Sequence, residues 1–68
     1  MVYVIGVFNE SYKKLGFVKS CSGRTFFSTQ DLSEAKRFNS KSMAVDMANE
    51  LDQQADRQGV YLIVEQIK

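Results

Sequence analysis

Strands that are apolar on both faces dominate this sequence, and only one segment is long enough to form a helix that covers a sheet. The clearest strand segments, residues 2–8 and 60–67, read VYVIGVF and VYLIVEQI and show almost no alternation of polar and apolar residues. A strand with one face in water alternates, whereas a near-continuous apolar run is typical of a strand buried on both sides. Since one helix covers one face, we expect the other face to meet another protein chain.

The small size of the chain also favours association. Its 68 residues predict a single domain, 1–68, in a size range where one hydrophobic core supplies little stability. The sequence has one cysteine, Cys21, and no histidine. An intrachain disulfide is therefore impossible, and the commonest metal ligand and general base are missing. We expect no metal and no cofactor, and we expect oligomerisation to supply the missing stability.

Charge and hydropathy predict a soluble cytoplasmic protein. The net charge is +1, so no strong overall field attracts the chain to a membrane or to nucleic acid. No apolar run approaches the ~20 residues of a membrane-spanning helix. A single free thiol fits a reducing cytoplasm.

The order of the segments predicts an α+β protein of β-β-β-α-β type. Asn9-Glu10-Ser11 and Ser20-Cys21-Ser22-Gly23 are typical turn sequences, and Gly59 stands where a helix C-cap is expected. The expected elements are strands at 2–8, 13–19, 25–28 and 60–67, a short helix at 32–38 and a main helix at 41–57.

Caps and an apolar stripe support the helices. Asp31 and Glu34 have the spacing of a capping box for the short helix, and Asn39-Ser40 offers a cap for the main helix. Helical spacing places Ala44, Met47, Ala48, Leu51 and Ala55 on one stripe. The small residues of this stripe predict close contact with the sheet, and we interpret Met43 and Met47 as packing residues.

These elements predict a mostly antiparallel four-stranded sheet with the order 4-1-2-3. If the helix returns the chain, the last strand pairs parallel to the first through a right-handed crossover. A hairpin centred near Ser11 places Gly6 opposite Gly16. The two glycines then leave a gap that admits the helix, or they mark only a local twist.

The candidate association face follows from the glycine gap. Val2, Val4, Gly6, Phe8, Gly16 and Val18 are expected beneath the helix. The opposite face is then exposed and has the composition of an interface core. Tyr61 and Ile63 of the last strand would enlarge it. A homodimer is the leading interpretation, a different protein partner is the second, and coverage by the 32–38 helix is the third. The candidate association face, opposite the expected helix, consists of Tyr3, Ile5, Val7, Leu15 and Phe17.

A basic hairpin offers a different interpretation. Lys13, Lys14, Lys19 and Arg24 lie in a stretch, 11–30, that has no acidic residue before Asp31. With Tyr12, Phe17, Phe26 and Phe27 nearby, these cations could hold a phosphate backbone while bases stack, which predicts low-specificity nucleic-acid binding. Cations on a hairpin also serve simply to solvate its edge.

Catalytic patterns are weak. Hydroxyl side chains lack a histidine base, and no glycine-rich phosphate loop occurs. Asp46 and Glu50 share a helix face, where solvation explains them better than a joint chemical role. Cys21 is expected to be exposed, without an assigned function. We therefore expect a protein that is not an enzyme.

The stretch 26–51, FFSTQDLSEAKRFNSKSMAVDMANEL, resembles a pattern found in small phage and prophage proteins. The pattern has an aromatic-Ser/Thr strand, an acidic turn, Ala-Lys-Arg-Phe and a helix with spaced alanines; the first and last strands are similarly placed. The resemblance implies packing roles for Ala35 and Phe38, caps at Ser40 and Gly59, and a bacterial cytoplasm. It also implies a small accessory protein without a cofactor that acts by binding a host or phage protein.

Overall fold

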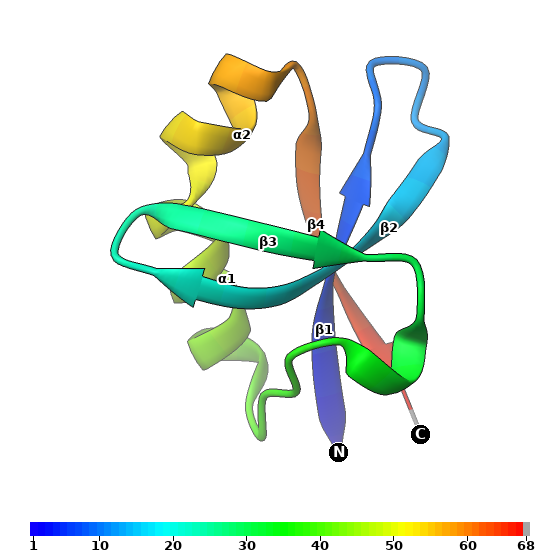
Figure 1. Cartoon of the computed structure of the whole chain (residues 1–68). Helices are drawn as coiled ribbons and strands as arrows, with labels where there is room; N and C mark the ends of the chain where they lie inside the picture. The colour runs from blue at the N-terminus through cyan, green and yellow to red at the C-terminus, as the bar shows by residue number, and fades with distance from the viewer. Residues whose placement is uncertain (68) are drawn as a thin grey trace.

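The computed structural model describes residues 1–67, which form one α+β unit (Figure 1). The predicted strands and the caps at Asp31, Ser40 and Gly59 are confirmed in outline. The main helix is divided at Leu51, whose ψ of −2° departs from the usual helical value although the residue stays in the right-handed helical region. The predicted helix at 32–38 is only one 3-10 turn, and 35–39 is not helical. The elements are β1 (Val2–Phe8), β2 (Lys14–Ser22), β3 (Thr25–Thr29), η1 (Leu32–Glu34), α1 (Lys41–Glu50), α2 (Asp52–Gln58) and β4 (Tyr61–Ile67).

All strand pairs of the sheet are antiparallel, and the order is β3-β2-β1-β4. The predicted order 4-1-2-3 names the same neighbours from the opposite edge. The predicted direction of the last strand is wrong, because β4 runs antiparallel to β1 over seven residue pairs. An extra pass of the chain explains the reversal. After β3 and η1, the extended segment beside Phe38 runs antiparallel to β1 before α1 begins.

That extended segment is held between two strands that separate from each other. β2 pairs with β1 only at three positions, with a bulge, and then continues with β3 across the direction of β1 and β4 (Figure 1). The Lys36 amide donates to the Val18 carbonyl at 2.9 Å, and Phe38 exchanges two backbone hydrogen bonds of 2.9 Å with Tyr3. Residues 36–38 thus occupy the space that β2 leaves beside the start of β1.

The hydrophobic core lies between the helices and the face of β1 that carries Ile5 and Val7, both of which are buried. This result corrects the predicted choice of face, because Tyr3, Ile5 and Val7 lie toward the helices and are not an exposed association surface. Small helix residues allow this close contact without a glycine gap in the strand. The buried helix positions are Ala44, Ala48, Leu51 and Ala55.

The glycine pair is also displaced from its predicted register. Gly6 lies opposite Phe17, and Gly16 lies opposite Val7, because a bulge shifts the β1–β2 pairing. Phe17 consequently shares a face with Gly6, opposite to Ile5 and Val7. Leu15 is exposed and Phe17 is half-buried. The five predicted association residues therefore do not form one surface.

Candidate interaction surface

An ion pair crosses the sheet over Gly6 on the face opposite the helices. The Lys14 ammonium of β2 lies 2.7 Å from Glu65 Oε1 of β4, and β1 lies between these two strands. The same ammonium stands 5.4 Å from the ring centre of Phe8 and 4.8 Å from that of Phe17, within cation–π range. Gly6 makes the crossing possible because its missing side chain leaves room for the Glu65 carboxylate and the Phe8 ring.

This ion pair leaves β4 without an uncompensated charge. Glu65 is the only charged residue between Tyr61 and Ile67, and Lys14 of the same chain neutralises it. The second carboxylate oxygen, Oε2, is buried and has no hydrogen-bond partner among the described residues. The rest of the strand is apolar or neutral.

β4 is an edge strand of the described sheet. It pairs with β1 along its whole length on one side, and none of the described strands pairs with its other side. The backbone N–H and C=O groups that point outward from such a strand are a template for pairing with another chain. Proteins commonly protect an edge with lysine, proline or a bulge. β4 has no lysine or proline between Tyr61 and Ile67, and its pairing with β1 is regular.

Two stacked tyrosines stand at the beginning of this edge. The rings of Tyr12 and Tyr61 lie 5.2 Å apart at an interplanar angle of 12°, and 66% of Tyr12 and 46% of Tyr61 are exposed. Ile63, two residues further along β4 and on the same face as Tyr61, is 39% exposed. We call the free edge of β4 together with Tyr12, Tyr61 and Ile63 the β4 surface.

The turn between β1 and β2 holds Tyr12 in an uncommon backbone conformation. Its φ is 58°, in the left-handed region that a bulky residue rarely adopts. Asn9 supports this turn, because its side-chain oxygen accepts hydrogen bonds of 2.9 Å from the amides of Ser11 and Lys13. The ring of Tyr12 is thereby directed onto Tyr61.

Tyr61 and Ile63 were offered as additions to the face of Tyr3, Ile5 and Val7, but they lie on the opposite face of the sheet. Tyr12 was not predicted as a member of the surface. Tyr61 lies opposite Phe8, and Ile63 lies opposite Gly6, so both belong to the face opposite the helices. A polar turn followed by an aromatic residue is too common a pattern to predict a stacked pair. The stack depends on a positive φ and on a strand about fifty residues away.

The four cations of the predicted nucleic-acid patch do not gather in one place. Lys13 and Lys14 stand at the start of β2, and Lys14 is engaged with Glu65. Lys19 lies in the middle of β2, 4.0 Å from Glu34. Arg24 stands in the turn beyond the other end of β2, beside Asn49 and Gln53. The length of β2 thus separates Lys13 and Lys14 from Arg24.

Two smaller predictions also need correction. Cys21 is half-buried rather than exposed, and its sulfur lies 3.5 Å from the sulfur of Met47. Asp31 does cap η1, but Glu34 accepts a hydrogen bond from Thr29 instead of completing a capping box. The Ser33 hydroxyl and then the Ser33 amide donate to the Asp31 carboxylate, and these bonds lower the pKa of Asp31 below its ordinary value.

No family model matches the chain, and no curated protein and no solved structure shows significant similarity to it. Among residues 1–67, neither α1, α2 nor η1 has the length and apolar character needed to cross a bilayer.

Proposed function

We propose that this protein acts by binding another protein chain through the β4 surface, and that a second copy is the occupant, giving a homodimer without catalytic activity. The carrying observation is that β4 is a seven-residue, charge-compensated strand with one unpaired side. Pairing of that side with a second strand satisfies its outward backbone groups.

A second copy suits this surface because two β4 strands can pair antiparallel about a two-fold axis. In such an arrangement each copy contributes the same residues, and charge repulsion between the two strands is reduced because Lys14 compensates Glu65 within each chain. Aromatic side chains are also enriched among the residues that contribute most to protein–protein affinity, and Tyr12 and Tyr61 fit that role.

The position of the basic residues supports a protein partner over a nucleic acid. Binding to a phosphate backbone requires several cations along one path. Here Lys13 lies at one end of β2, Arg24 lies beyond its other end, and Lys14 is paired. The accessory role in a phage or prophage, and the bacterial cytoplasm, belong to the proposal through the sequence resemblance alone.

The test compares the molar mass of three proteins by light scattering after size exclusion, from about 5 to 500 µM. We expect a dimer for the unmodified protein and a monomer for Ile63→Lys, because a lysine on an edge strand opposes the pairing of that edge with another strand. Val45→Lys is the matched control, since Val45 is an exposed apolar residue of α1. A monomer at every concentration contradicts the homodimer, and dissociation by Val45→Lys contradicts the assignment to β4.

The same variants also test whether the β4 surface binds a different protein. If the unmodified protein is a monomer, it is used as bait beside the Ile63→Lys and Val45→Lys variants. A partner retained by Val45→Lys and lost by Ile63→Lys would identify the β4 surface as a binding site for that partner. Equal capture by all three would exclude it.

A further inference from the structure

Backbone hydrogen bonds at the two ends of β1 show to which side each of its residues directs its N–H and C=O groups. The Tyr3 amide and the Tyr3 carbonyl both bond to Phe38, on the extended segment beside the start of β1. Just beyond the other end, the Asn9 amide donates to the Lys13 carbonyl at 3.0 Å. In antiparallel pairing, successive residues direct their backbone groups to opposite sides of the strand. The odd-numbered residues of β1 therefore bond toward β2 and the segment 36–38, and the even-numbered residues bond toward β4.

The same alternation determines which backbone groups of β4 are free. Gly6 lies opposite Ile63 and Val4 lies opposite Glu65, so Ile63 and Glu65 direct their backbone groups toward β1. The alternate residues of β4 direct theirs to the free edge. These outward residues are Leu62, Val64 and Gln66.

The outward residues determine how a second copy can pair, because antiparallel strands bond only where outward residues lie opposite outward residues. We infer that β4 pairs with β4 of the second copy about a two-fold axis through Val64. Val64 then lies opposite Val64 of the second copy, and Leu62 lies opposite Gln66 of the second copy. Every outward N–H and C=O group of β4 is bonded in this register. The inference rests on the homodimer proposed above and specifies the contact within it.

The two neighbouring registers are less favourable. A two-fold axis through Ile63 places Gln66 opposite Val60, which precedes β4. The Val60 amide is not free, because it donates to the Ala55 carbonyl at 3.0 Å. A two-fold axis through Glu65 places the two Glu65 residues opposite each other, and like charges in directly opposed positions are destabilising.

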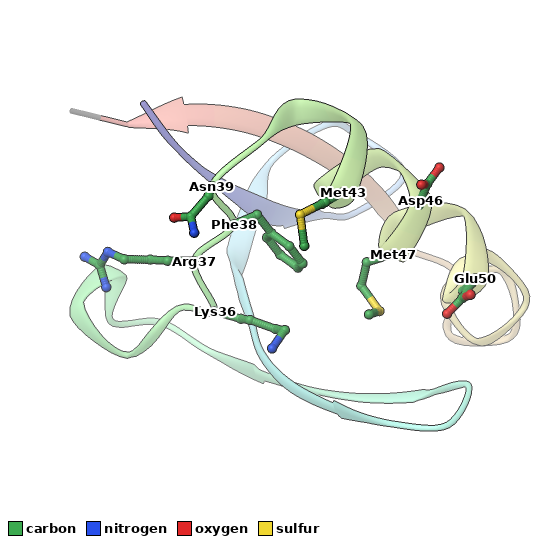
Figure 2. A pocket seen from close by; sticks show the side chains of 8 residues that line it. All are labelled: Lys36, Arg37, Phe38, Asn39, Met43, Asp46, Met47 and Glu50. Carbon is green, nitrogen blue, oxygen red and sulfur yellow. The ribbon is translucent and has the colours of Figure 1, made fainter.

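The groove between α1 and the extended segment 36–39 is not part of this contact. The segment lies on the other side of β1 from β4, because Phe38 bonds to Tyr3 and β4 pairs along the opposite side of β1. Met43 is directed toward Phe38 across this groove (Figure 2). Met43 is 58% exposed, and it therefore provides a control position away from the paired edge.

Disulfide cross-linking between copies measures the register directly. In a Cys21→Ala background, Val64→Cys should form a linked dimer on mild oxidation, because the Cα atoms of a directly opposed bonded pair are about 5.5 Å apart. Ile63→Cys should not, since its counterpart is displaced along the strand and the two Cα atoms are about 8 Å apart. Met43→Cys controls for links formed by random collision.

A mixture of two variants gives a second cross-link with its own control. Leu62→Cys and Gln66→Cys should link to each other when they are mixed, and neither should link to itself. Light scattering on the same samples separates the two proposals. A dimer that links through Ile63→Cys and not through Val64→Cys overturns the register and leaves the homodimer standing, whereas a monomer at every concentration overturns both.

Amide hydrogen exchange tests the register without cysteines. In the unmodified dimer the amides of Leu62, Val64 and Gln66 should exchange at least about ten-fold more slowly than in Ile63→Lys. The Glu65 amide is directed toward β1 and should exchange equally in both proteins. Protection of Leu62 and Val64 without Gln66, or of Val64 and Gln66 without Leu62, overturns the register through Val64.

Discussion

A missing side chain at Gly6 decides how the open face of the sheet is packed. A Cβ there would meet the Glu65 carboxylate and would lie 2.8 Å from Cε1 of Phe8. Both are the outer parts of side chains that can turn away, so Gly6→Ala displaces the Lys14–Glu65 pair without moving the backbone. At Gly16 the Cβ would instead meet the backbone carbonyl of Thr29, which belongs to the β2–β3 pairing.

The two glycines therefore predict different losses of stability. We expect Gly6→Ala to lower the free energy of unfolding by about 1 kcal/mol and Gly16→Ala by about 3 kcal/mol, because only the second substitution forces a strand to move. Urea denaturation followed by circular dichroism measures both values. A larger loss for Gly6→Ala than for Gly16→Ala would contradict this explanation.

Asp31 provides a test of a single hydrogen bond. Its pKa is lowered first by the Ser33 hydroxyl, so Ser33→Ala should raise that pKa toward the ordinary value, while the amide bond of Ser33 remains. A carboxyl whose pKa is lower in the folded state stabilises the fold above its unfolded pKa, and this contribution is lost as the pH falls through the folded pKa. NMR titration of the Asp31 carboxyl carbon checks the shift, with Ser42→Ala as a control that should leave it unchanged.

At the scale of elements, local signals in the sequence predicted most boundaries correctly. Ser40 accepts the Met43 amide at 3.2 Å, and Gly59 ends α2 with φ 71°. Both depend on neighbouring residues only, which is why the sequence revealed them. The break at Leu51 was not predicted, because no glycine or proline marks it and the buried stripe continues through it.

The Ser40 cap predicts a measurable contribution to α1. Ser40→Ala removes the acceptor of the Met43 amide and should lower the free energy of unfolding by about 1 kcal/mol. Ser42→Ala, within the first turn of the same helix, should be neutral or slightly stabilising, since alanine has the higher helix propensity. Thermal unfolding of the two variants in parallel gives the comparison. Equal losses for both would mean that Ser40 does not cap the helix.

At the scale of the whole molecule, the proposed homodimer would add to the stability that the small core supplies. Binding to the folded state raises its apparent stability by mass action. We therefore expect the Tm of the unmodified protein to rise with protein concentration, and the Tm of Ile63→Lys to be independent of it. Differential scanning calorimetry at several concentrations measures the difference. A Tm of the unmodified protein that stays constant would count against the homodimer.

The sequence did not predict the residues of either candidate site correctly. The expectation of an association surface was a prediction from two-faced strands, yet the residues named for it were largely those of the core, such as Ile5 and Val7. The groove between α1 and residues 36–39 could not be predicted, because it requires an extended pass at 36–38, where the sequence predicts a helix. Asp46 and Glu50 were recognised as a pair on one helix face, but not as one side of a groove.

By itself the sequence determined the kind and approximate extent of the strands and helices, the caps and the α+β class, because these depend on spacing and on residues a few positions apart. Only the tertiary structure decided which face of β1 the helices cover, since both faces are almost equally apolar and the pattern does not distinguish them. The tertiary structure also decided the direction of β4, because the extended segment at 36–38 adds one pass of the chain before α1. The ion pair between Lys14 and Glu65, which are 51 residues apart, also depends on the tertiary structure. Its carboxylate fills the space over Gly6 on the face away from the helices.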